Sequence, residues 1–417
     1  MIGEMKKNTI NRSLLPSGVR VVSEKVEGSQ SIAVGIWINS GSRDESEDKS
    51  GFTHFLEHMV FKGTPKWSAK DIAFEFDSMG GDLNAATGKE YTCFYARILS
   101  ENLEKSLEIM FDMIKNPLLD PTDISNEIQV VLEEIAMHND SPDELVLEYL
   151  ARALWGNHPA GKSVLGSAET IQKITREKLM EFHKNTYVSS RMIISAAGNL
   201  DHEKLCELVL THTEDIPKGE PPQRRNIPKF NPNTIIVNKK TEQAHLSIGS
   251  HGLPAGHEDR FALAVADNIL GGSMSSRLFQ IIREEKGLAY SVYSFNTMLT
   301  GCGLVGIYCG TSPSQTKEVV GLIERILDDI RERGFESEEM DRAKNHLKGS
   351  LLICMEDNSN RMNRLAKAEL AGLELLTVDE VLARIMKVSL KDIDKVFAQT
   401  WGENKRGVAI VGPFEDK

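Results

Sequence analysis

The amino-acid sequence contains the same order of predicted elements twice, and this repeat restricts the possible folds more than any other feature. Each half contains a turn followed by a strand, a strand followed by a charged loop, a helix ending in glycine, a long amphipathic helix and a short apolar strand. The segments of the first half are 13–25, 31–45, 51–63, 103–114 and 193–200, and those of the second half are 229–240, 244–259, 259–272, 319–330 and 407–414. Because the copies keep their order and a nearly constant offset, two domains of one ancestral pattern explain them better than coincidence does.

A proline-rich segment separates the two halves. Five of the 14 prolines lie within 217–232, PKGEPPQRRNIPKFNP, which is typical of a linker. The 417 residues also exceed the usual size of a single hydrophobic core. We therefore predict a first domain at 1–216, a linker at 217–233 and a homologous second domain at 234–417.

The order of strands and helices indicates the fold class. Strands predicted at 91–99 and 304–309 follow loops directly and do not alternate with helices. This order favours antiparallel pairing over a doubly wound parallel sheet. We therefore predict an α+β protein with two structurally similar domains, each a mainly antiparallel sheet with helices packed on one face.

The composition, with 40% apolar and 26% charged residues, is that of an ordinary globular protein. The net charge of −12 argues against a nucleic-acid partner, because such proteins need cations to meet the phosphates. No stretch approaches the roughly 20 apolar residues that span a bilayer, and the first residues do not resemble a secretory signal. The five cysteines lack CxxC spacing and are typical of buried free thiols in a reducing compartment. We therefore expect a cytoplasmic protein without membrane insertion.

The strongest chemical signal is an H-x-x-E-H motif within a predicted helix at 51–64, GFTHFLEHMVFKGT. His54 and His58 are four residues apart, so both imidazoles lie on one helix face within reach of a single ion. Two neutral imidazoles suit Zn²⁺, and a third protein ligand leaves the fourth position for water. Glu57 could then take a proton from that water as it attacks a carbonyl. Two unrelated histidines on an exposed polar face remain the alternative for the motif taken alone.

The third ligand is expected to be a carboxylate from another helix. The segment 120–140 is a strong helix, and Glu127 and Glu134 lie on one stripe of it because seven residues make nearly two turns. The helical pattern alone does not distinguish Glu133 from Glu134, since adjacent residues point about 100° apart. A solvated acidic edge is the alternative for this stripe.

The sequence resembles the pitrilysin family of inverzincin zinc metallopeptidases along essentially its whole length. The similarity is to the shorter-chain branch that contains the mitochondrial processing peptidase β subunit and bacterial processing-type peptidases. The segments that carry it are GFTHFLEHMVFKGT (51–64), GGDLNAATGKEYTCFYA (80–96), VVLEEIAMHNDSPDE (130–144) and SSRLFQIIREEKGLAYSV (275–292). The resemblance implies one zinc ion per chain and an endopeptidase activity.

The resemblance also implies roles for individual residues. The zinc ligands would be His54, His58 and Glu134. Glu57 would be the general base, and Glu127 would support the site from outside the ligand set.

Four further residues match positions that handle substrate in the family. Asn84 and Ala85 match an edge strand that pairs with an extended substrate backbone. Tyr290 and Arg283, from the second half, match a pair that reaches the active site, where the tyrosine stabilises the oxyanion and the arginine helps to hold substrate. Without the resemblance, these residues would be interpreted as a turn, a packed tyrosine and a surface arginine.

The second half lacks the histidine pair, since the aligned segment 262–267 is ALAVAD. The second domain is therefore predicted to be a non-catalytic copy. By analogy with the family, the chain would act as a homodimer or with a related non-catalytic subunit. Paired domains would close a chamber that admits peptides or unfolded segments.

Two alternatives to an enzyme remain open at this point. One is a non-catalytic scaffold subunit of the same fold, although such a subunit has no reason to keep His54, Glu57, His58 and Glu134 together. The other is a purely structural zinc site, which would be expected to have four protein ligands.

Overall fold

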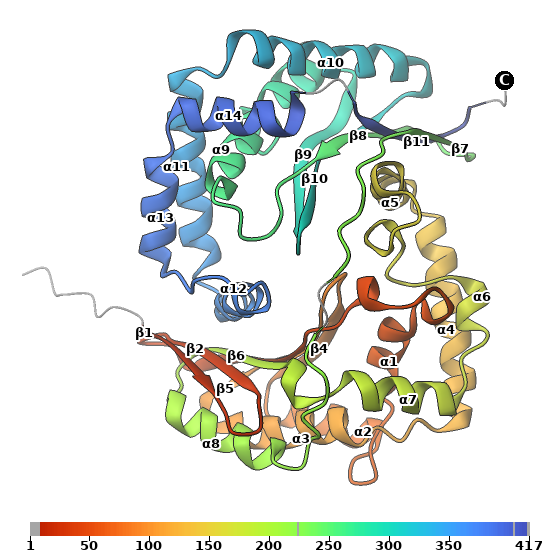
Figure 1. Cartoon of the computed structure of the whole chain (residues 1–417), viewed down its shortest axis with the longest axis vertical. Helices are drawn as coiled ribbons and strands as arrows, with labels where there is room; N and C mark the ends of the chain where they lie inside the picture. Colours follow the sequence, from red (N-terminus) through yellow and green to blue (C-terminus); the bar gives the residue numbers. More distant parts are fainter. Residues whose placement is uncertain (1–8, 223–224, 403–404, 415–417) are drawn as a thin grey trace, which may run out of the picture. The chain divides into compact units, whose positions relative to one another are not determined.

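The structure is a computed structural model that describes residues 9–222, 225–402 and 405–414. The chain divides into two compact units, each built on one sheet (Figure 1). The first unit comprises Met1–Ile135, Ser163–Arg224 and Cys354–Thr377, and the second comprises Ala136–Lys162, Arg225–Ile353 and Val378–Lys417.

The sheet of the first unit has six strands in the order β1-β2-β6-β3-β5-β4. The strands are β1 (Thr9–Leu14), β2 (Arg20–Lys25), β3 (Ser31–Ile38), β4 (Asp82–Thr87), β5 (Thr92–Leu99) and β6 (Met192–Gly198). β2 and β6 are parallel, whereas the other neighbouring pairs are antiparallel. The alternating residues Ile32, Val34, Ile36 and Ile38 of β3 all face one hydrophobic core, as expected from the twofold period of a strand.

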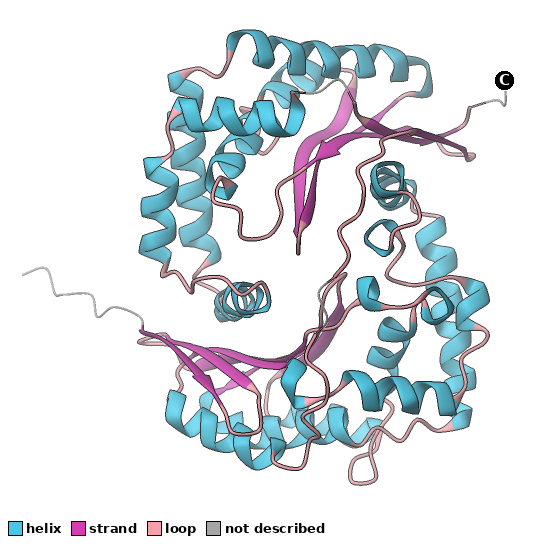
Figure 2. Cartoon of the chain, in the orientation of Figure 1, coloured by secondary structure: helices cyan, strands magenta, loops and turns pink. Residues whose placement is uncertain are grey.

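Helices cover this core face of the first sheet (Figure 2). The longer helices are α1 (Phe52–Val60), α2 (Ala69–Ser78), α3 (Leu103–Lys115), α4 (Pro121–Asn139), α7 (Arg176–Thr186) and α8 (His202–Thr213), with a short α6 (Ala168–Ile171). Short 3₁₀ turns are η1 (Ser42–Asp44), η2 (Glu47–Lys49), η3 (Ser100–Asn102) and η5 (Ser189–Arg191).

The opposite face of the first sheet is covered by α12 (Asn358–Leu370), which comes from the second half of the sequence. Its apolar residues Met362, Leu365 and Ala366 pack in one cluster with residues of the strands. Ion pairs of two buried carboxylates also join α12 to the sheet. Glu24 of β2 pairs with two arginines of α12, and Glu369 of α12 pairs with two arginines of the sheet.

The sheet of the second unit has five strands in the order β7-β11-β8-β10-β9, of which β7 and β11 are parallel. The strands are β7 (Thr234–Asn238), β8 (Ala244–His251), β9 (Ala289–Leu299), β10 (Cys302–Thr311) and β11 (Gly407–Gly412). One face carries α9 (Arg260–Leu270), α10 (Thr316–Arg333), α11 (Ser337–Cys354), α13 (Val378–Lys387), α14 (Leu390–Trp401) and the π-helical η6 (Phe279–Glu285). The other face carries α5 (Pro142–Trp155), with η4 (Pro159–Gly161) after it; η7 (Pro313–Gln315) precedes α10.

These two mixed, mainly antiparallel sheets with helices confirm the predicted α+β class. The segments 1–216 and 234–417 each supply one sheet, but the compact units differ from these halves because each takes a helix from the other half. α12 and α5 are amphipathic and cover the second face of a sheet, which the prediction of helices on one face did not include. None of the five cysteines forms a disulfide; Cys93, Cys302 and Cys309 are buried, whereas Cys354 is exposed.

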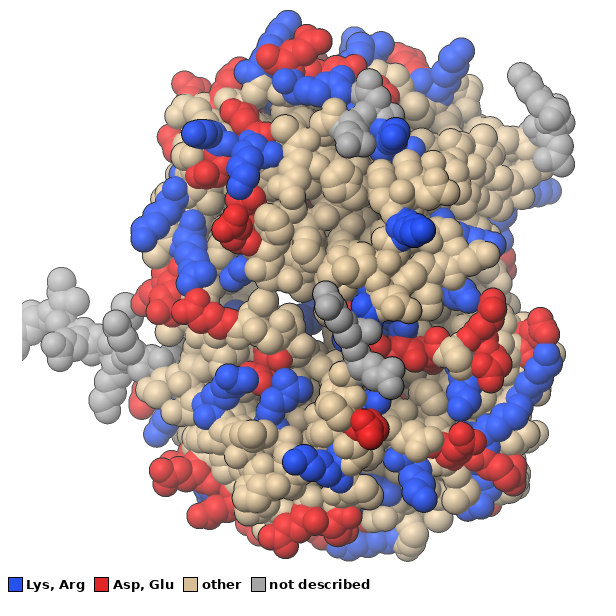
Figure 3. Space-filling view, in the orientation of Figure 1, with Lys and Arg blue, Asp and Glu red and all other residues tan. Residues whose placement is uncertain are grey.

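Charged side chains of both signs are interspersed over the face shown in Figure 3. A mixture of both signs is typical of a solvated surface. No helix within the described ranges is long and apolar enough to cross a membrane.

Candidate metal centre and active site

Helix α1 presents the H-x-x-E-H motif because its other side is anchored in the core. Phe52, Phe55, Leu56 and Met59 are almost fully buried, which turns the three motif residues towards the opposite side. The helix begins after Gly51, whose φ of 90° lies in the left-handed region that glycine adopts without strain. A glycine has no side chain to cap the helix.

Glu45 replaces the missing cap. Its buried carboxylate accepts hydrogen bonds from the backbone N–H groups of Gly51 (2.8 Å) and Thr53 (2.6 Å). These groups belong to the orphan donors of the first helical turn, and a carboxylate also complements the helix dipole there. The first turn of the motif helix is thus held by a residue outside the helix.

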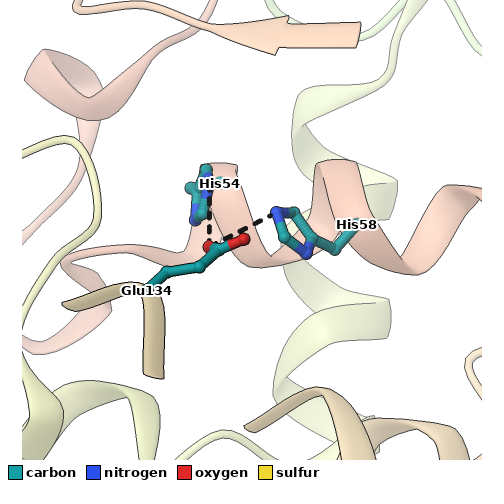
Figure 4. A group of neighbouring side chains, drawn as sticks. All are labelled: His54, His58 and Glu134. Atoms are coloured by element: carbon teal, nitrogen blue, oxygen red, sulfur yellow. Dashed lines mark ion pairs between the residues drawn. The ribbon is translucent and has the colours of Figure 1, made fainter. Parts of the chain in front are cut away.

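His54 and His58 of α1 meet Glu134 of α4 in the one group of metal-binding type found within the described residues (Figure 4). Glu134 Oε2 lies 3.8 Å from His54 Nε2 and 3.7 Å from His58 Nε2. Ligand atoms of a tetrahedral zinc site are separated by about 3.4 Å, given metal–ligand bonds of about 2.1 Å. The structure therefore selects Glu134 as the partner of the histidines and leaves Glu133 exposed.

Glu127 orients His58 from behind the cluster. Its Oε1 accepts a hydrogen bond from His58 Nδ1 at 2.8 Å, and Lys62 pairs with its other oxygen. Burial raises the pKa of Glu127, but the bonds with His58 and Lys62 outweigh it and leave the pKa below its ordinary value. Because Nδ1 then carries the proton, the lone pair of Nε2 is directed towards Glu134, as in the carboxylate–histidine–metal arrangement.

The donor set fits a divalent cation. Glu134 Oε2 is buried without a hydrogen-bond partner in the part of the chain that the structure describes. Burial, together with the neighbouring His58, lowers the pKa of His54 to about 4, so this imidazole is neutral at neutral pH. Two imidazoles and a buried carboxylate oxygen that accepts no hydrogen bond form a site that a zinc ion would satisfy.

Glu57 lies on the same helix side but is outside the group of possible ligands. Its Oε2 accepts a hydrogen bond from the hydroxyl of Thr87 at 2.5 Å. Burial is the main reason that the pKa of Glu57 is raised, and the charge of Glu134 adds to the effect. A mostly buried carboxylate with a raised pKa beside a metal centre is suited to accepting a proton.

Asn84 and Ala85 lie on β4, which is the edge strand of the first sheet among the described strands. They pair with Tyr95 and Phe94 of β5, and the outer edge of β4 has no strand beside it in the described part of the unit. Such an edge presents backbone donors and acceptors that an extended peptide can use.

Arg283 and Tyr290 lie together in the second unit. The guanidinium of Arg283 is placed 4.7 Å from the ring centre of Phe279 and 4.8 Å from that of Tyr290. It also donates a hydrogen bond to the carbonyl oxygen of Tyr290 at 3.0 Å. Tyr290 is 78% exposed. The roles of both residues at the metal centre remain predictions.

Sequence reasoning missed Thr87, Lys62 and Glu45. The period of two along β4 places Thr87 on the same sheet face as Ala85, so its direction could have been found from the strand pattern. Its partner Glu57, like the partners of the other two residues, depends on contacts between separate elements.

Comparisons with known proteins match both halves of the chain. A family model described as "Insulinase (Peptidase family M16)" matches residues 20–168, and one described as "Peptidase M16 inactive domain" matches residues 173–347. An uncharacterized zinc protease of Streptomyces coelicolor is 38% identical, covering 100% of this chain and 92% of the relative. The uncharacterized zinc protease YmxG of Bacillus subtilis is also 38% identical, covering 97% and 98%.

Solved structures share the fold. A protease from Helicobacter pylori superposes with a TM-score of 0.88 at 23% identity, covering 97% of this chain and 100% of that one. A peptidase M16 inactive domain from Pseudomonas fluorescens gives a TM-score of 0.92 at 20% identity, covering 98% and 99%. At these identities the superpositions show the fold alone.

Proposed function

The chain belongs to peptidase family M16, and from this premise we propose that it is a zinc-dependent endopeptidase that hydrolyses extended peptides or unfolded segments. The observation that carries the proposal is the meeting of His54, His58 and Glu134, with Glu57 beside them and outside the ligand set. Relatives that match 97% to 100% of the chain are themselves named zinc proteases.

The chain's own residues would divide the work of peptide hydrolysis. His54, His58 and Glu134 would hold the zinc ion, which when bound supplies Lewis acidity towards the scissile carbonyl and the attacking water. Glu57 would accept a proton from that water and pass it to the leaving amine, because a general base can return its proton as a general acid. Glu127 would keep His58 in the tautomer that the site needs.

Substrate would bind as an added strand on the free edge of β4. In this mode, backbone hydrogen bonds near Asn84 and Ala85 would hold the peptide, which would have to be extended to form them. Tyr290 would donate a hydrogen bond to the developing oxyanion, and Arg283 would help to hold substrate near it. The first domain would thus be catalytic, and the second would contribute to it without a metal of its own.

We further propose a cytoplasmic protein that acts as a homodimer or with a related non-catalytic subunit, in which paired domains close a chamber around the peptide. The alternative of a non-catalytic scaffold subunit leaves the grouped site residues without a role. A scaffold has no use for the His54, His58 and Glu134 group, for the carboxylate of Glu57 bonded by Thr87, or for the carboxylate of Glu127 bonded to His58, and these contacts support the enzyme instead.

Metal analysis combined with Glu57→Gln tests the proposal. The wild type should contain one zinc ion per chain and cleave an unstructured peptide, and a chelator should abolish the cleavage. Glu57→Gln should keep the zinc and lose the cleavage. Zinc-free protein without chelator-sensitive activity would refute the proposal, and unfolding on chelation would instead indicate a structural metal.

A further inference from the structure

The hydroxyl of Thr87 joins the edge strand of the first sheet to the carboxylate of Glu57. Thr87 is the last residue of β4, and its Oγ1 donates to Glu57 Oε2 at 2.5 Å. Both side chains are largely shielded from water. A hydrogen bond to a charged acceptor in such surroundings is short and about twice as strong as one between neutral groups.

This bond restricts the orientation of Glu57. With Oε2 engaged by Thr87, the carboxylate is held against rotation about its terminal bond, and Oε1 remains for another proton donor. Within the described residues, no second side chain donates a hydrogen bond to the Glu57 carboxylate. The hydroxyl of Thr87 is therefore the hydrogen-bond donor that restrains the orientation of Glu57.

The C-terminal end of β4 and the start of α1 are both hydrogen-bonded to the segment 41–45. Two backbone hydrogen bonds hold the turn after Thr87. The N–H of Ser42 donates to Gly88 O (3.1 Å), and the N–H of Arg43 donates to Lys89 O (2.8 Å). The buried guanidinium of Arg43 also pairs with Glu90 in this turn at 2.6 Å.

Two residues after Arg43, Glu45 accepts hydrogen bonds from the N–H groups of Gly51 and Thr53 at the start of α1. The segment 41–45 therefore connects the tip of the β4–β5 hairpin with the start of the motif helix. A displacement of β4 relative to α1 would have to break these bonds, so the distance from Thr87 to Glu57 is held by more than their own contact.

We propose that Thr87 is a positioning residue that sets the orientation of Glu57 and ties it to the strand that receives the peptide. The proposal rests on the proposed function, because it takes Glu57 as the general base and β4 as the binding edge. A peptide added to β4 is then placed in register with the base by the same strand. Loss of the hydroxyl should lower kcat while leaving peptide affinity and zinc content unchanged.

Thr87→Val removes the hydroxyl and keeps the β-branched shape, whereas Thr87→Ser keeps the hydroxyl. Loss of a hydrogen bond to a charged group should reduce kcat of Thr87→Val about 10- to 100-fold. KM should stay within about twofold, because the interaction is made by the base and not by the peptide. Thr87→Ser should retain most of the wild-type kcat.

The matched control is Thr92→Val. Thr92 is paired with Thr87 across the hairpin, and its hydroxyl bonds Ser40 O at 3.2 Å without contacting Glu57. Thr92→Val should lose about as much thermal stability as Thr87→Val, but it should keep the wild-type kcat. It separates loss of a hydroxyl in the hairpin from loss of the bond to the base.

Three readouts decide the outcome: steady-state kinetics, zinc per chain, and the dissociation constant of a labelled peptide measured on a Glu57→Gln background. A selective fall in kcat for Thr87→Val, restored in Thr87→Ser, supports the proposal. An unchanged kcat, a loss of zinc, weaker peptide binding or an equal defect in Thr87→Ser each overturns it. If the zinc-loaded wild type is itself inactive, the proposed function fails and the proposal falls with it.

Discussion

Glu45 allows a quantitative test of how the first turn of the motif helix is held. Burial, the largest influence, raises the pKa of its carboxyl from 4.5 to about 7, although the hydrogen bonds from Thr53 and Gly51 act in the opposite direction. In the unfolded chain the same carboxyl is solvated and has its ordinary pKa. The folded protein therefore binds the proton of Glu45 more tightly than the unfolded chain does.

The sign and the size of the effect follow from this difference. Because the folded pKa is the higher one, the stabilisation from protonation is fully present below pH 4.5 and is lost as the pH rises to about 7. At roughly 1.4 kcal/mol per pH unit, the change across this window amounts to about 3 kcal/mol in the free energy of unfolding.

The measurement compares the wild type with Glu45→Gln, which has no titrating group at this position. The free energy of unfolding of the zinc-loaded proteins is measured by chemical denaturation at several pH values between 4.5 and 7.5. Other titrating groups contribute to both proteins, so the difference between them isolates Glu45. The advantage of the wild type over the variant should shrink by about 3 kcal/mol as the pH rises through this window.

Two results would contradict this reasoning. If the difference in unfolding free energy between wild type and variant does not depend on pH, burial and the hydrogen bonds cancel in their effects on the pKa of Glu45. A difference that grows as the pH rises would mean that the backbone N–H groups of α1 outweigh burial and keep the carboxylate ionised in the folded state.

Three further predictions concern other contacts. Glu127→Gln removes the charged acceptor of His58 Nδ1, so zinc affinity measured by competition with a chromogenic chelator should fall about 10- to 100-fold; an unchanged affinity would exclude the orienting role. Glu24→Gln leaves two arginines of α12 without their carboxylate, which should lower the free energy of unfolding by about 3 kcal/mol and speed amide hydrogen exchange selectively in α12. Exchange that is no faster in α12 than elsewhere would argue against these ion pairs holding the helix. Tyr290→Phe should lower kcat about 10²- to 10³-fold at similar KM if its hydroxyl stabilises the oxyanion, and kinetics like those of the wild type would rule this out.

The sequence by itself determined the features that depend on local periodicity. His54 and His58 had to share one helix face because four residues make little more than one turn, and the alternating isoleucines and valine of β3 had to face one core. The two-sheet α+β organisation could likewise be predicted, since the repeated order of strands and helices is itself a property of the sequence.

Only the tertiary structure decided which distant groups meet. Glu133 and Glu134 differ by one helical step, and the rotation of α4 against α1 brought the second to the histidines. The same holds for Thr87 and Glu57, and for α12 and α5, which cross to the sheet of the other half. Periodicity specifies the direction of a side chain within its own element. Its partner depends on the packing of whole elements, which is a property of the complete core.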